Sequence, residues 1–150
     1  MSRYDVVREY PYPIAEVWHV LTDPARVAQW TTTGRGGRPE GFAPVVGTEF
    51  RFVGKPAMGW AGIVYCEIQE ADAPRRLRYT WKGDAGAGEV TEVTYLLEEI
   101  PGGTRFTWQH TGFTGVGGFA MSKLLGSVRR RMLTEGLPPV LAAHHAAQPS

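Results

Sequence analysis

The sequence predicts an α+β domain in which helices cover one face of an antiparallel sheet of about six strands. Two observations predict this class. Between residues 48 and 110, apolar and polar side chains alternate with a period of two, as in half-buried strands. From residue 116 to residue 145, apolar side chains recur at helical spacing instead. A chain of 150 residues can bury a substantial core, so we expect one domain over residues 1–150.

The first predicted elements are a strand and two short helices. Residues 3–10 alternate as a strand, and residues 14–22 have the apolar spacing of a short amphipathic helix. Asp23 and the proline after it open a second helix over residues 25–30, because aspartate accepts hydrogen bonds from free amides and proline fits a first helical turn. Residues 31–47 are rich in glycine and proline and predict a long loop.

The remaining strands form a meander. Period-two alternation predicts strands over residues 48–53, 60–70, 75–82, 89–100 and 104–110. Glycine and proline clusters separate these segments and predict the turns between them. Together with the first strand they make up the predicted sheet.

The C-terminal segment predicts one long amphipathic helix that lies across this sheet. Its apolar stripe consists of Met121, Leu124, Leu125, Val128, Met132, Leu133, Leu137, Val140 and Leu141. Pro138 and Pro139 lack amide donors, so we expect a kink near residues 135–137. The basic run from Arg129 to Arg131 spreads over most of a helical turn, and we interpret it as a solvated face in preference to an anion site.

Short motifs stand in a characteristic order along nearly the whole chain. They are Arg8-Glu9-Tyr10, Pro13, Val17-Trp18, Leu21-Thr22-Asp23-Pro24, Trp30, Pro74-Arg75-Arg76-Leu77, Tyr79-Thr80-Trp81, Val93-Thr94-Tyr95, Gly103-Thr104-Arg105 and His110-Thr111-Gly112-Phe113. In this order the chain resembles the START-like (SRPBCC) helix-grip superfamily, specifically its branch similar to the activator of the ninety-kilodalton heat-shock protein ATPase. After Phe113 it departs from many members of that branch, because Gly117-Gly118-Phe119 stands where they carry a Gly-Trp pair.

The resemblance implies a curved antiparallel sheet that grips the C-terminal helix around an apolar pocket, as in polyketide cyclases and lipid-transfer domains. Aromatic residues on the predicted inward faces agree with such a pocket, because small-molecule sites have mostly apolar walls and few polar groups. For any single aromatic residue, ordinary core packing is the better interpretation. The candidate ligand-binding residues are Trp30, Phe52, Trp60, Val64, Cys66, Tyr79, Trp81, Tyr95, Phe106, Trp108, His110, Met121, Leu125 and Val128.

His110 is the one candidate for chemistry. Its imidazole could hydrogen-bond a ligand or act as an acid or base, or it could simply bond a backbone carbonyl. A nucleophile pair of Cys66 and His110 is the weaker idea, because a buried cysteine usually behaves as a small hydrophobe. His144 and His145 are adjacent on a helix and do not point at one ion, so we expect no metal, and no cofactor motif is present.

Three functions remain open at this point. The leading one is binding of a small hydrophobic or aromatic molecule; the alternatives are a polyketide cyclase or dehydratase-like enzyme that uses His110, and a module that interacts with a chaperone or forms a homodimer. The net charge of +1 gives no reason to expect nucleic acid, and no run of about 18 apolar residues predicts a membrane span. One cysteine and a start without an export segment predict a cytoplasmic protein.

Overall fold

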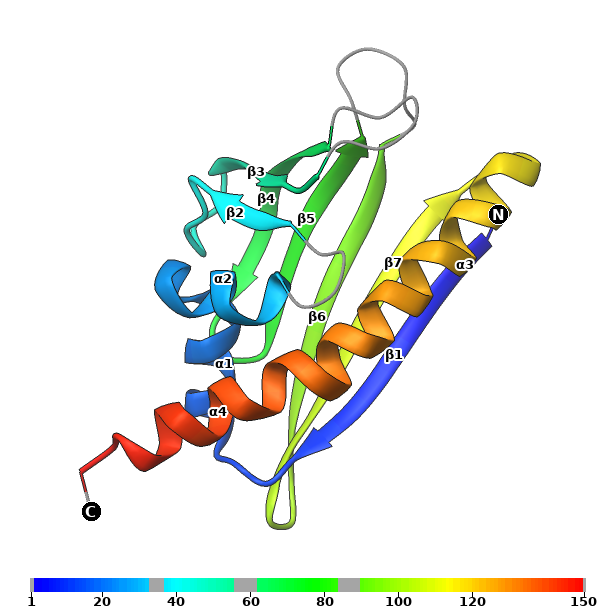
Figure 1. Cartoon of the computed structure of the whole chain (residues 1–150). Helices are drawn as coiled ribbons and strands as arrows, with labels where there is room; N and C mark the ends of the chain where they lie inside the picture. The colour runs from blue at the N-terminus through cyan, green and yellow to red at the C-terminus, as the bar shows by residue number, and fades with distance from the viewer. Residues whose placement is uncertain (1, 33–36, 56–61, 84–89, 150) are drawn as a thin grey trace.

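The computed structural model of the chain describes residues 2–32, 37–55, 62–83 and 90–149. Within this part, seven strands form one antiparallel sheet in the order β1-β7-β6-β5-β4-β3-β2 (Figure 1). The strands are β1 (Ser2–Tyr10), β2 (Arg38–Glu40), β3 (Glu49–Val53), β4 (Ile63–Asp72), β5 (Arg76–Gly83), β6 (Thr91–Ile100) and β7 (Gly103–Phe113). The helices are α1 (Ile14–Thr22), α2 (Pro24–Thr31), α3 (Gly115–Arg131), the π-helical turn η1 (Met132–Gly136) and α4 (Leu137–Ala146).

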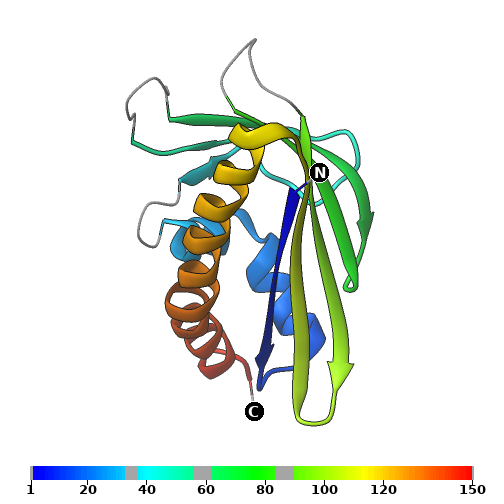
Figure 2. The ribbon, with the colours of Figure 1, turned by 90° about the vertical axis from the view of Figure 1, so that its right-hand side faces the viewer.

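This architecture confirms the predicted α+β helix-grip fold. Figure 2 shows the long C-terminal helix on one side of the curved sheet, with α1 and α2 on that same side. The sheet has one strand more than predicted, because β2 lies inside residues 31–47, which were expected to be a loop. Three residues at a sheet edge are too few to show a period of two, so the sequence pattern could not reveal this strand.

The two short helices form as the sequence predicts. The side chain of Asp23 accepts a hydrogen bond of 3.3 Å from the amide of Ala25, and Pro24 occupies the first turn of α2. The indole Nε1 of Trp30 donates to the carbonyl of Val20 at 2.9 Å, which ties α2 to α1. This bond fixes the buried Trp30 ring under the C-terminal helix.

The C-terminal helix continues past the two prolines by widening for one turn. The amide of Leu137 bonds to the carbonyl of Met132, five residues back, so the carbonyl of Leu133 loses its usual partner. The Tyr10 hydroxyl donates to that carbonyl at 2.7 Å. Pro138 then falls in the first turn of α4, where a missing amide is tolerated. The irregularity expected near residues 135–137 is therefore a π-helical turn over Met132–Gly136.

The helix buries different kinds of side chain along its length. From η1 onward the buried residues are mainly large and apolar: Met132, Leu133, Leu137, Val140 and Leu141. In α3 the buried residues are Ser122, Gly126 and Arg129, while Met121 and Leu124 are exposed. The predicted apolar stripe is thus correct for the second half of the helix and wrong at Met121 and Leu124. Among the described residues, no helix is both long and apolar enough to cross a membrane.

The position of α3 follows from its small residues. α3 packs against β1 and β7 at one side of the sheet, as Figure 1 shows. A Cβ atom at Gly126 would lie 3.3 Å from Cγ of Tyr4, so glycine at this position permits the close approach of helix and strand.

Candidate functional site

Most of the predicted ligand-binding residues meet on the concave face of the sheet. Met121 is an exception, because its neighbour Ser122 takes the sheet-facing position and Met121 is left 46 % exposed. Trp60 lies outside the described residues. His110 is fully buried. The buried apolar cluster contains Trp30, Phe52, Val64, Cys66, Tyr79, Tyr95, Phe106 and Trp108, and Trp81, Leu125 and Val128 are partly buried against it.

The aromatic rings at the centre of this face pack against one another. Tyr79 and Tyr95 meet edge to face with 5.6 Å between ring centroids, and their hydroxyls lie 3.0 Å apart in a hydrogen bond. The Tyr95 ring lies 4.7 Å from that of Trp108, and the Trp30 ring meets Trp108 edge-on at 6.5 Å. Burial raises the pKa of both tyrosines, so their hydroxyls stay protonated. These rings form structural core, whereas the half-buried Trp81 lies at its border.

His110 belongs to a chain of buried hydrogen bonds across neighbouring strands. Thr91 Oγ1 lies 3.2 Å from the carbonyl of Trp81, to which it donates, and 2.7 Å from His110 Nε2. Because the hydroxyl has one proton, His110 Nε2 must donate to Thr91 and carry the ring proton. His110 Nδ1 then accepts from the Tyr4 hydroxyl at 3.1 Å. Both ring nitrogens are therefore bonded to the protein.

The titration of these groups follows from burial. Loss of water around His110, with the nearby Arg129 charge as a second cause, lowers the pKa of its imidazole from 6.5 to about 3. Burial raises the pKa of Tyr4, an effect that Arg129 and Trp108 partly offset because both are N–H donors near its oxygen. At neutral pH the imidazole and the phenol are both uncharged.

Arg129 is the residue whose environment sequence reasoning missed. The interpretation of Arg129 to Arg131 as a solvated face is wrong for Arg129, which is 4 % exposed, and right for the exposed Arg130 and Arg131. Its guanidinium carbon lies 3.9 Å from the centroid of the Trp108 ring and 5.6 Å from that of Trp81. Ser122, Gly126 and Arg129 are spaced four and three residues apart, the spacing of one helix face, and this was the available signal.

The nitrogen atoms around Arg129 are poorly satisfied. Arg129 Nη1 donates to the thioether sulfur of Met132 at 2.9 Å, and a thioether is a weak acceptor. Arg129 Nε and Trp108 Nε1 are buried and form no hydrogen bond of good geometry, although the Tyr4 oxygen lies near both side chains. Among the described residues, no carboxylate forms an ion pair with this guanidinium. The buried polar groups that converge here are thus Tyr4, Thr91, His110 and Arg129, which we call the polar cluster.

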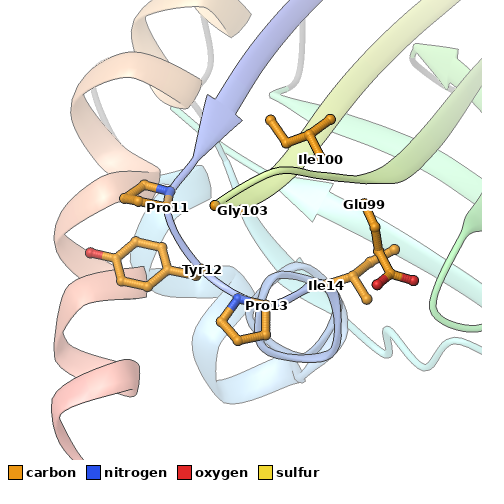
Figure 3. A pocket seen from close by; sticks show the side chains of 8 residues that line it. Pro11, Tyr12, Pro13, Ile14, Glu99, Ile100 and Gly103 are labelled. Atoms are coloured by element: carbon orange, nitrogen blue, oxygen red, sulfur yellow. The ribbon is translucent and has the colours of Figure 1, made fainter.

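Two surface hollows lie elsewhere. The first, of about 200 Å³, is shown in Figure 3 and is lined by Pro11, Tyr12, Pro13, Ile14, Glu99, Ile100, Gly102 and Gly103. Its charged group, Glu99, pairs with Arg75 at 3.3 Å. The Tyr12 ring turns toward the C-terminal helix, where it meets the His145 ring at 5.2 Å. The one charged group of this hollow is thus already paired, and the Tyr12 ring points away from its centre.

The second hollow, of about 290 Å³, lies where the ladder between β4 and β5 is interrupted. Pairing passes from Tyr65 opposite Lys82 to Ile68 opposite Tyr79, and the Glu67 amide donates to the Thr80 hydroxyl at 3.0 Å in between. The lining residues are Glu49, Phe50, Tyr65, Cys66, Glu67, Thr80, Lys82 and Val90.

The other candidates for chemistry do not form a site. Burial raises the pKa of the Cys66 thiol, so it stays protonated, and His110 bonds Thr91 and Tyr4 rather than Cys66. His145 bonds Glu16 at 2.8 Å, whereas the His144 ring stacks on another histidine, so the two adjacent rings diverge. Within the described part of the chain, no three histidine, cysteine or acidic side chains are placed to hold a metal ion.

Comparison with known proteins gives one family match. The family model described as activator of Hsp90 ATPase homolog 1-like protein matches residues 11–132. A search of curated proteins finds no match.

Several solved structures share the fold at low sequence identity. A protein from Mesorhizobium loti has a TM-score of 0.78 at 23 % identity over 95 % of this chain and 98 % of its own. A protein from Rhodobacter sphaeroides has a TM-score of 0.74 at 23 % identity over 99 % and 94 % of the two chains. DynU16, from the dynemicin biosynthetic locus, has a TM-score of 0.66 at 24 % identity over 92 % of this chain, which spans 49 % of DynU16.

Proposed function

The chain belongs to the family of activator of Hsp90 ATPase homolog 1-like proteins, and from this fold and its buried groups we propose that it binds a small aromatic or hydrophobic molecule. The ligand lies between the concave face of the sheet and α3. Its body stacks at the border formed by Trp81, Leu125 and Val128, which are partly buried beside the core. The polar cluster lies beside this border, since the His110 ring is 5.2 Å and the Arg129 guanidinium 5.6 Å from the Trp81 ring.

The observation that carries the proposal is the contrast between the two halves of the C-terminal helix. A helix that only closes a core presents large apolar side chains, as Leu133, Leu137 and Leu141 do. α3 instead turns Ser122, Gly126 and Arg129 toward a sheet of large aromatic rings. Buried N–H groups without partners lie beside them. A ligand site needs small helix residues opposite aromatic walls and hydrogen-bond donors that are free to bind the ligand. A fully packed core avoids both features.

We expect a neutral solvatochromic dye to bind the native protein with micromolar affinity, about 8 kcal/mol. Ser122→Phe should weaken this binding by about 10-fold or more, because the new ring enters the proposed space from the helix side. Lys123→Phe is the matched control, since Lys123 is exposed and the same ring there leaves the space free. Fluorescence titration measures all three affinities.

Cys66→Phe repeats the test from the sheet side, because Cys66 is buried on β4. A folded Ser122→Phe or Cys66→Phe protein that binds the dye as tightly as the native protein overturns the proposed location. Folding of each variant is checked by its thermal unfolding transition.

The environment of His110 supports a binding role over a cyclase-like enzyme. A general acid or base needs a pKa near the working pH and a free nitrogen that can reach the substrate. His110 has a pKa of about 3, and both of its nitrogens are bonded to Thr91 and Tyr4. Its role here is to hold the polar cluster in one arrangement.

A second candidate function is interaction with a protein partner, as the family description suggests. Its support is the set of exposed apolar side chains on the first half of α3, namely Val116, Phe119, Met121 and Leu124. We expect Phe119→Ser with Leu124→Ser to weaken binding to Hsp90 by at least 10-fold in calorimetry, with dye binding unchanged. Native protein that does not bind Hsp90 removes this candidate.

A further inference from the structure

Arg129 carries a buried charge that the described protein does not neutralise. Arginine is almost never fully buried unless it is paired, because removal of a cation from water costs more than most single contacts return. Arg129 is 4 % exposed, and the described residues offer its guanidinium no carboxylate. Its contacts include the faces of Trp108 and Trp81, the sulfur of Met132 and the neutral hydroxyl of Tyr4. These contacts stabilise a cation in part, and none of them supplies a negative charge.

Among the residues that the structure describes, no neighbouring side chain supplies that charge by ionising. The Arg129 charge contributes to the pKa shifts of five buried groups, Tyr4, Cys66, Tyr79, Tyr95 and His110. Burial raises the pKa of the phenols and the thiol and lowers the pKa of the imidazole, so all five groups are neutral near pH 7. None of these five groups therefore neutralises the positive charge of the guanidinium, which lies among aromatic rings.

The two unpaired donors of this region lie together. Arg129 Nε has no partner, and neither has Nε1 of Trp108, the ring over which the guanidinium lies at 3.9 Å. The Tyr4 hydroxyl cannot donate a hydrogen bond to a ligand, because it already donates to His110 Nδ1. The bond between Thr91 and His110 Nε2 fixes the tautomer in which Nδ1 is an acceptor. The site thus presents N–H donors and a positive charge, which is the complement of an oxyanion.

We propose that the ligand carries a carboxylate, which accepts hydrogen bonds from Arg129 Nε and Trp108 Nε1 while its aromatic or apolar body packs against Trp81. This inference rests on the proposed function and names its ligand class. A planar guanidinium matches a carboxylate better than any other side chain does, and the low polarity around it strengthens the pair. The charge then gives specificity for acids over neutral analogues of the same shape.

The test uses two probes that differ in one group, 2-naphthoate and 2-naphthamide, in calorimetry with the native protein. We expect 2-naphthoate to bind at least 10-fold more tightly than 2-naphthamide. Arg129→Met should abolish this preference. The variant should fold, because an apolar side chain of similar length replaces an unpaired buried cation.

Arg130→Met is the matched control, because Arg130 is the next residue and is exposed; it should retain the preference. Trp108→Phe keeps a ring and removes one donor, so it should lower the preference for 2-naphthoate several-fold even if Arg129→Met does not fold. If the native protein binds the two probes equally well, the proposal that the ligand carries a carboxylate is wrong, whereas the proposed function still stands. Binding of neither probe, together with no binding of the neutral dye, overturns both.

Discussion

Leu133→Ala is expected to lower the free energy of unfolding by about 3 to 5 kcal/mol, the range for emptying a core site. Leu133 is fully buried in η1, where the helix closes the apolar half of the core. The same substitution at Leu124, which is 53 % exposed, should change stability by less than about 0.5 kcal/mol. Denaturation in guanidinium chloride measures both variants on one scale.

The pair of leucines tests how the helix is turned. Both belong to the apolar stripe that the sequence predicts, so an equal loss at the two positions would show that the stripe faces the sheet throughout. The Tyr10 hydroxyl bonds the main-chain carbonyl of Leu133, so this bond survives the substitution and does not enter the comparison. A loss confined to Leu133 separates the core-closing half of the helix from α3.

Acidification from pH 6.5 to pH 3 is expected to lower the free energy of unfolding by as much as about 5 kcal/mol through His110, since each pKa unit corresponds to about 1.4 kcal/mol. The unfolded chain binds a proton at this histidine below its ordinary pKa of 6.5, whereas the folded protein binds it only near 3. The free energy of unfolding therefore falls as the pH is lowered through this window. Above the window, the contribution of His110 no longer changes with pH. Denaturant midpoints between pH 4 and pH 8 measure the slope.

His110→Gln isolates this contribution, because glutamine can hydrogen-bond but does not titrate. Between pH 4 and pH 6, unfolding of the native protein should take up about one proton more than unfolding of the variant. Identical slopes in the native protein and His110→Gln would mean that His110 protonates freely while folded, which would restore it as a candidate acid or base.

Local sequence signals predicted the fold well and the site only in part. Alternation, the Asp23 cap and helical spacing act over a few residues, and the strands and helices formed where they indicated. Burial of Arg129 depends instead on where α3 crosses the sheet, which the basic run itself does not indicate. A rule that holds for most basic runs assigned it to the surface, although its spacing from Ser122 and Gly126 pointed inward.

The aromatic candidates illustrate the same limit. The sequence placed Tyr79, Tyr95 and Trp108 on inward faces, and they are buried there. It could not tell rings that pack against one another from rings that face a ligand, because both need the same residue types. In the structure all three rings pack against one another, and Trp108 in addition carries a buried nitrogen without a hydrogen-bond partner.

The π-helical turn lets the two halves of the C-terminal helix be oriented separately. One extra residue in a turn rotates everything after it by about 100° relative to an uninterrupted α-helix. Loss of one residue from Met132–Gly136 would therefore swing Leu137 and Leu141 out of the core while α3 stayed in place. Because the Tyr10 hydroxyl on β1 bonds the carbonyl that the wide turn leaves without an amide partner, an edge strand of the sheet fixes the rotation of the core-closing half of the helix relative to α3.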